Sequence, residues 1–150
     1  MIIKRWDPVA HRPYTKNFKP SEFFCRCNMC SDQIINEDII HLAQKIRDTF
    51  GKSLSINSGY RCPRYNSTLE GASKMSQHVL GRAMDIFIFG VTPLQIAQVA
   101  IVNGAMGLGI APLFCHIDNR EGVSDCKIWQ YTDGKPVAAS KETLQALGRI

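Results

Sequence analysis

The chain contains 150 residues, of which 45% are hydrophobic, and carries a formal net charge of +5. This length suits one globular domain, and the hydrophobic fraction is sufficient for a buried core. The basic residues are scattered and form neither a long run nor an aromatic-basic motif, so we expect no nucleic-acid binding. No apolar run approaches the roughly 20 residues that span a bilayer, and we therefore expect no membrane segment.

The N-terminal segment has no apolar core followed by small residues, which argues against a secretory signal. We therefore expect synthesis in the cytoplasm, with delivery by another route if the protein works outside the membrane. Residues 1–17 contain scattered prolines and aromatic residues without any period. This pattern predicts an irregular arm that lies on a domain formed by residues 18–150.

The clearest helix is predicted for residues 36–50. Asn36 can cap its start, apolar residues recur at helical spacing through the segment, and Gly51 is a typical residue at a helix end. Further helices, each opened by a capping residue or a proline, are predicted at residues 63–70, 92–103 and 140–147. Strands are predicted at residues 54–58, 82–89, 106–110, 113–118 and 127–131.

The strand at residues 82–89 is apolar on both faces, which indicates a central position in a sheet. A carboxylate in such a strand is costly unless it is paired or bound to a metal. Asp85 is therefore more informative than a surface acid would be. Its partner could be an arginine, Arg61 or Arg82, or a metal ion.

Two histidines can join Asp85 in a metal site. His78 lies in the loop before this strand, and His116 lies in the strand at residues 113–118. Two imidazoles and one carboxylate form a typical zinc set that leaves one coordination position open. Asp118 shares a strand face with His116 and could orient its ring. Taken singly, each of these residues is more often a hydrogen-bonded core or rim residue.

The cysteines raise a separate question. The six are Cys25, Cys27 and Cys30, which are clustered in the sequence, and Cys62, Cys115 and Cys126, which are dispersed. A second, structural zinc site at the cluster would need a fourth ligand, for which Cys62 and His41 are candidates. Free thiols, or a disulfide formed after release, are the alternatives, although a disulfide framework is not expected without a secretion signal.

Three stretches carry a family resemblance: NSGYRCP at residues 57–63, SQHVLGRAMD at residues 76–85 and FCHID at residues 114–118. They closely resemble the zinc D-alanyl-D-alanine carboxypeptidase superfamily, which includes D,D-dipeptidases, D,D-carboxypeptidases and phage L-alanyl-D-glutamate endopeptidases. The resemblance covers about residues 18–132 and is greatest to the branch found in phage genomes and bacterial wall hydrolases. It implies the α+β fold shared with the hedgehog signalling domain, a small, mostly antiparallel sheet flanked by helices.

The resemblance also implies a function. The protein would be a zinc-dependent hydrolase of amide bonds in peptidoglycan stem peptides, a carboxypeptidase or endopeptidase, acting on the cell wall as a released phage endolysin or within a bacteriophage virion. Its partners could then include other phage tail or lysis proteins. The implied roles are zinc binding by His78, Asp85 and His116, stabilisation of the scissile carbonyl by Arg61, and substrate binding by Ser76, with Trp129 and Tyr131 as candidate walls of the cleft.

One departure concerns the general base. Many members carry an acidic residue three positions before the second zinc histidine, and others carry a histidine two positions before it. Leu113 and Phe114 occupy those positions here and cannot accept a proton. Asp118 is therefore the candidate base, with Glu121 and Asp125 as weaker ones. A chain without a base would instead be a non-catalytic zinc module that binds wall polymer or a protein partner, and a virion structural protein of the same fold is a further alternative.

Overall fold

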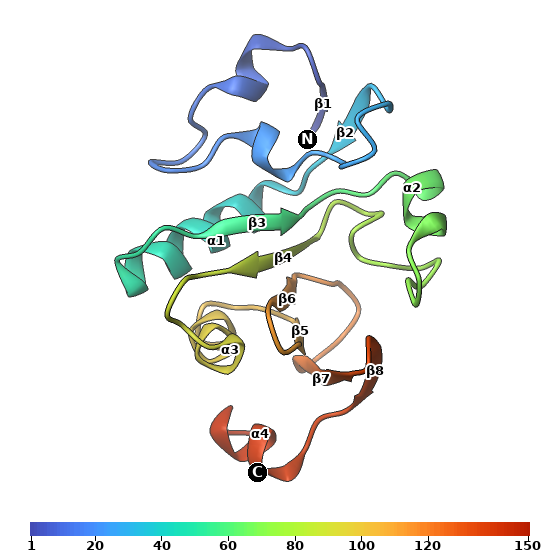
Figure 1. The fold of residues 1–150 in the computed structure, drawn as a ribbon. Helices are drawn as coiled ribbons and strands as arrows, with labels where there is room; N and C mark the ends of the chain where they lie inside the picture. Colours follow the sequence, from blue (N-terminus) through green and yellow to red (C-terminus); the bar gives the residue numbers. More distant parts are fainter.

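The computed structural model describes residues 1–150 as an α+β fold with two sheets (Figure 1). A two-stranded antiparallel sheet pairs β1 (Ile2–Lys4) with β2 (Asp32–Ile34). The six-stranded sheet has the order β3-β4-β6-β5-β7-β8, and only β5 and β7 are parallel. Its strands are β3 (Ser55–Ser58), β4 (Ala83–Phe87), β5 (Gly107–Ile110), β6 (Cys115–Asp118), β7 (Lys127–Thr132) and β8 (Lys135–Ala138). The predicted α+β class with a mostly antiparallel sheet is confirmed.

The four helices lie close to the predicted positions: α1 (Glu37–Phe50), α2 (Pro63–Thr68), α3 (Pro93–Val102) and α4 (Lys141–Ala146). Asn36 caps α1 by accepting the backbone N–H of Asp38 at 3.0 Å. Gly51 ends this helix with a φ of 62°, a left-handed conformation that glycine adopts without a steric penalty. No helix of the chain combines the length and the apolar character that a membrane span requires.

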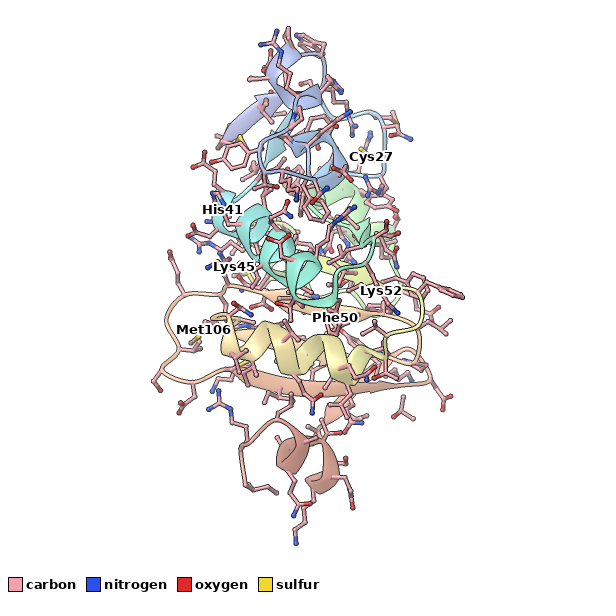
Figure 2. The ribbon with its side chains drawn as sticks, turned by 90° about the vertical axis from the view of Figure 1, so that its left-hand side faces the viewer. Cys27, His41, Lys45, Phe50, Lys52 and Met106 are labelled. Carbon is pink, nitrogen blue, oxygen red and sulfur yellow. The ribbon has the colours of Figure 1, made fainter.

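The core lies between one face of the main sheet and the helices α1 and α3, which pack side by side there (Figure 2). Met84 and Ile86 of β4 are fully buried, and so is Ile117 of β6. Side chains alternate between the two faces of a strand, so Asp85 and His116 point to the opposite face. The candidate metal ligands therefore lie on the face that α1 and α3 leave uncovered.

The N-terminal segment is more ordered than the sequence indicates. Besides β1, it contains a 3-10 helix at Pro8–His11, and Ala10 and Phe18 are fully buried. The terminal ammonium of Met1 donates to the carbonyl of Ile35 at 2.7 Å. The segment thus lies against the rest of the fold, but it contains a strand and a 3-10 helix where the sequence pattern predicts no regular element. Short strands without alternation give no periodic signal, which explains the difference.

The last strand of the sheet is β8, whereas the sequence pattern predicts β7 as the last. All four β8 residues are exposed, so no alternation of apolar residues marks the strand. The turn before it does carry a signal, because Asp133 and Gly134 adopt φ angles of 52° and 75°. An Asp-Gly pair with two positive φ angles is typical of a two-residue hairpin turn.

Candidate active site

Three buried side chains converge on the uncovered face of the sheet: His78, Asp85 and His116. The Nδ1 atom of His116 lies 3.0 Å from Oδ1 of Asp85 and 3.2 Å from Nε2 of His78. The third distance, from Nε2 of His78 to Oδ1 of Asp85, is 3.3 Å. We call these three residues the triad.

Strand pairing places two members of the triad. Asp85 of β4 lies directly opposite His116 of β6 in the antiparallel register, so both project from neighbouring positions on one face. His78 reaches them from the tight turn before β4. Its backbone N–H donates to Oγ of Ser76 at 3.2 Å, and Gly81 closes the turn with a φ of 70°. A Cβ on Gly81 would lie 2.2 Å from the carbonyl oxygen of Ile34.

An acceptor outside the triad fixes the orientation of each imidazole. Nδ1 of His78 lies 2.7 Å from the carbonyl oxygen of Gly59, which can only accept, so this nitrogen carries the proton. Nε2 of His116 lies 2.8 Å from Oδ2 of Asp118 and donates to it in the same way. His78 therefore presents Nε2 to the triad, and His116 presents Nδ1. Orientation of this kind is typical of metal-binding histidines.

Burial and charge act differently on the three members. Burial lowers the pKa of His78, which keeps this ring neutral at neutral pH. Burial also opposes the charged form of His116, but hydrogen bonds to Asp118 and Asp85 outweigh it and raise the pKa of that ring. Burial disfavours the charged Asp85 as well, yet the neighbouring His78 and His116 lower its pKa far below the usual range. The site thus holds a carboxylate that attracts positive charge.

The triad fits a zinc ion. Tetrahedral zinc with ligand bonds of about 2.0–2.1 Å holds nitrogen and oxygen ligands about 3.3 Å apart. The three separations of 3.0, 3.2 and 3.3 Å match this value. Two nitrogen ligands and one oxygen ligand also suit zinc in chemical type. Three protein ligands leave a fourth position for water or substrate.

Arg61 lies beside the triad. Its Nη2 atom donates to Oδ2 of Asp85 at 3.0 Å, and its Nε atom donates to Oγ of Ser58 at 3.0 Å. Only 15% of this side chain is exposed. The guanidinium therefore holds the second oxygen of Asp85 and leaves Oδ1 to the two histidines. The arginine predicted to stabilise substrate also positions a candidate metal ligand.

Asp118 lies behind His116 and is fully buried. Arg120 binds both of its oxygens, with Nε at 2.8 Å from Oδ1 and Nη2 at 2.6 Å from Oδ2. Burial disfavours the charged Asp118, but the hydrogen bonds from Arg120 and His116 outweigh it and lower its pKa below the usual range. A fully paired carboxylate outside the cleft is poorly placed to accept a proton from a substrate. The contacts instead favour the orienting role considered for Asp118.

A cleft of about 610 Å³ opens over the triad. The aromatic residues Phe114, Trp129 and Tyr131 line it, together with residues 69–73 and 75–77. The ring of Trp129 lies 5.2 Å from that of His116, between their centroids. Ser76 and Arg61, the other predicted substrate contacts, also border the cleft.

The cleft contains two acidic residues, Asp85 and Glu70. The weaker base candidates Glu121 and Asp125 are exposed and lie outside it, where Glu121 pairs with Arg82. Sequence reasoning missed Glu70, because nothing in the sequence shows how residues 69–77 fold back over the sheet. It also missed Arg120, which the alternation of His116, Asp118 and Arg120 could have placed on the same face.

The four cysteines of the candidate second site also converge: Cys25, Cys27, Cys30 and Cys62. His41, the other candidate for the fourth ligand, is exposed on α1, where its ring lies against Tyr14. Cys62 is therefore the residue that completes this group. Cys115 and Cys126 lie apart from it and are free thiols.

Comparison with known proteins agrees with the geometry of the triad. No curated protein and no solved structure gives a significant match to the chain. The peptidase M15 family matches residues 16–118, which is more than half of the chain and includes the whole triad. This family comprises zinc-dependent metallopeptidases related to the D-alanyl-D-alanine carboxypeptidases. The chain therefore belongs to the peptidase M15 family.

Proposed function

We propose that this protein is a zinc peptidase that hydrolyses amide bonds in peptidoglycan stem peptides. The observation that carries the proposal is the triad itself, three donor atoms 3.0–3.3 Å apart under an open cleft. Outer acceptors hold both imidazoles in the orientation that metal binding requires. Residues that serve only packing are not expected to line an open cleft, whereas all three triad residues do.

The chemistry divides between the metal and the chain. A bound zinc ion supplies Lewis acidity, which polarises a carbonyl and lowers the pKa of water. Arg61 borders the cleft and donates to the scissile carbonyl oxygen as that atom gains negative charge. Ser76 and Trp129 also line the cleft and contact the peptide there.

The motifs around the triad favour stem peptides as the substrate class, because they resemble those of peptidases that act on D-amino acids. The net charge of +5 also suits long-range attraction to an anionic wall. The proposal includes action on the wall after release or within a phage particle, and this setting rests on the resemblance alone. Mass spectrometry of purified particles tests it.

Glu70 is the candidate that the structure offers for proton transfer. It is the one carboxylate lining the cleft that is not a member of the triad. Glu70 is also exposed, so it can exchange protons with solvent. Asp118 remains the competing candidate for proton transfer. If it instead orients His116, it acts on the reaction only through the triad.

The direct test incubates the zinc-loaded protein with purified muropeptides of known structure and identifies products by mass spectrometry. We expect cleavage at one type of amide bond, with one new amine for each bond broken. Muropeptides with and without a terminal D-alanyl-D-alanine distinguish a carboxypeptidase from an endopeptidase. Intact muropeptides after incubation with a protein that has bound zinc at the triad would refute the proposal.

A non-catalytic zinc module that binds wall polymer or a protein partner is the second candidate. Its supporting observation is that Leu113 and Phe114 stand where many relatives carry the proton acceptor. This candidate predicts that zinc-loaded protein sediments with purified cell walls and leaves every stem peptide uncut. Cleavage of any stem peptide would exclude it.

A further inference from the structure

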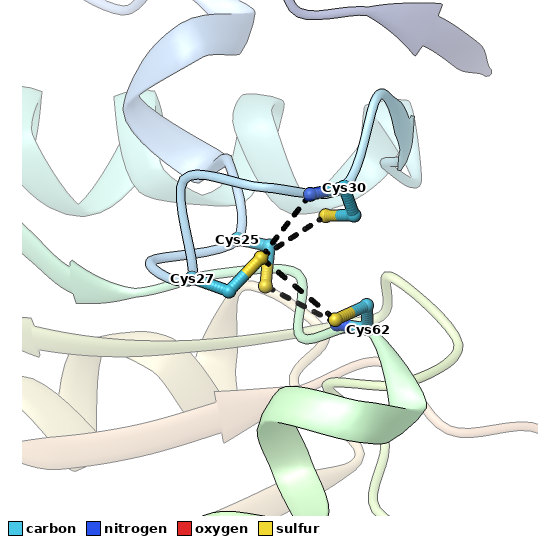
Figure 3. Close-up of side chains that lie close together, drawn as sticks. All are labelled: Cys25, Cys27, Cys30 and Cys62. Carbon is cyan, nitrogen blue, oxygen red and sulfur yellow. Dashed lines mark hydrogen bonds between the residues drawn. The ribbon is translucent and has the colours of Figure 1, made fainter.

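Four thiols from two separate segments point toward one another (Figure 3). They are Cys25, Cys27 and Cys30 from the loop before β2, and Cys62 from the start of α2. All four sulfur atoms lie within 4.8 Å of one another. The Sγ atom of Cys27 lies 3.4 Å from that of Cys30 and 3.9 Å from that of Cys62.

Backbone N–H groups surround these sulfurs. Cys27 accepts from the N–H groups of Met29 and Cys30, at 3.3 and 3.4 Å. The N–H of Cys62 lies 3.3 Å from the sulfur of Cys25, and the N–H of Tyr65 lies 3.4 Å from the sulfur of Cys62. Donors directed at sulfur stabilise thiolate over thiol, because a thiolate is the stronger acceptor.

A cation also flanks the group. The guanidinium of Arg5 lies 3.6 Å from the sulfur of Cys30 and 3.9 Å from that of Cys27. Carbonyl oxygens of Cys25 and Cys30 hold it in place, at 2.7 and 2.6 Å. Four thiolates around a divalent metal carry a net negative charge, which Arg5 partly offsets. Gln33 adds a side-chain N–H to Cys30 at 3.3 Å.

We propose that these four cysteines bind a second, structural zinc ion. Tetrahedral zinc with sulfur bonds of about 2.3 Å holds its sulfurs about 3.8 Å apart, close to the separations between these thiols. One disulfide would use only two of the four thiols and would not explain why the other two converge with them. Four protein ligands fill the coordination sphere, so this site leaves no position for a substrate.

The site would join the N-terminal segment to the segment that supports the triad. Cys62 directly follows Arg61. Gly59, two residues before Arg61, orients His78 through its carbonyl oxygen. The backbone N–H of Tyr60 donates to the carbonyl of Phe23 at 2.8 Å. A Cβ on Gly59 would lie 2.5 Å from that same carbonyl oxygen. A zinc ion at the cysteines would therefore fix the distance between the two segments.

The first test counts metal in purified wild-type protein and in His116→Ala. We expect two zinc ions per wild-type chain and one in the variant, because only the triad is damaged. The cobalt-substituted variant should show the intense near-ultraviolet absorption of thiolate bound to cobalt. One zinc in the wild type and none in His116→Ala would overturn the proposal.

A second test uses matched cysteine variants. Cys27→Ser should lose one zinc and the cobalt–thiolate absorption, whereas Cys126→Ser, outside the cluster, should keep both. Non-reducing mass spectrometry of the wild type reports the state of the thiols. Free thiols after metal removal support the zinc site. A disulfide among these four residues in freshly purified protein, or a zinc content unchanged in Cys27→Ser, would contradict it.

Discussion

At the scale of single residues, the positions of Asp118 and His116 determine how each can contribute to the site. His116 presents Nδ1 to the triad because Asp118 accepts from its Nε2 atom at 2.8 Å. Arg120 in turn holds Asp118 with two hydrogen bonds. The three side chains form a hydrogen-bonded chain that begins at the cleft and includes the buried Asp118. We therefore propose that Asp118 orients a metal ligand and that a different residue moves the proton.

Replacement of Asp118 tests that separation. Asp118→Ala should weaken zinc binding at the triad by roughly 10- to 100-fold, because His116 loses its orienting acceptor. Competition with a chelator of known affinity measures the change, and Glu121→Gln, an exposed carboxylate, is the matched control. Unchanged zinc affinity with complete loss of cleavage would instead assign proton transfer to Asp118.

Replacement of Glu70 tests its proposed role in proton transfer. Glu70→Gln should lower kcat by roughly 10²- to 10⁴-fold, the usual contribution of a general base, and leave zinc affinity unchanged. Steady-state kinetics on a cleaved muropeptide measures the effect. The nearby Ser73→Ala, in the same loop, controls for disturbance of the cleft wall. Full activity in Glu70→Gln would remove Glu70 from the mechanism.

At the scale of elements, the pairing of β4 with β6 brings two members of the triad together. Asp85 and His116 are opposite partners in the register, and Gly107 of β5 lies opposite Asp118 on the other edge of β6. A Cβ on Gly107 would lie 2.2 Å from Oδ2 of Asp118. The absence of a side chain at this position leaves space for the buried carboxylate of Asp118.

A methyl group at Gly107 should therefore disturb both stability and the site. Gly107→Ala should lower the free energy of unfolding by about 1–3 kcal/mol, the usual cost of overpacking. Urea denaturation of the metal-free protein measures this cost, and zinc affinity should fall along with it. Wild-type stability together with wild-type zinc affinity in Gly107→Ala would show that the close approach to Asp118 is unimportant.

Much of this arrangement could be predicted from the sequence. Alternation along a strand placed His116 and Asp118 on one face, and the apolar setting of Asp85 indicated a special partner. Register and loop position depend on tertiary contacts, so the sequence could not show that residues 69–77 bring Glu70 to the cleft. The buried state of Asp118 depends in the same way on Gly107 and Arg120.

At the scale of the whole molecule, the two candidate metal centres lie in different parts of the fold. The triad lies on the main sheet, and the four cysteines join the loop before β2 to the start of α2. Spacing alone leaves the fourth ligand of the cysteine cluster open between Cys62 and His41. The fold decides between them, because only Cys62 reaches the other three thiols.

The buried carboxylates make the stability of the metal-free protein depend on pH. The pKa values of Asp85 and Asp118 are lower in the folded protein than the usual value of about 3.9. Their contribution to stability is therefore present above about pH 4 and is lost as the pH falls toward the folded values. The urea midpoint of the wild type should decrease as the pH is lowered from about 5 to about 2. The midpoint of Asp118→Asn should decrease less steeply over the same range. Equal slopes in the two proteins would contradict this assignment.

The central claim is that the triad binds the zinc on which peptide cleavage depends. The most direct measurement titrates zinc into metal-free wild-type protein and into His116→Ala, and follows the release of new amines from purified muropeptides. We predict that wild-type cleavage rises with added zinc and that His116→Ala stays inactive at the same zinc concentrations. Cleavage by the metal-free wild type, or full recovery of cleavage in His116→Ala, would contradict the account.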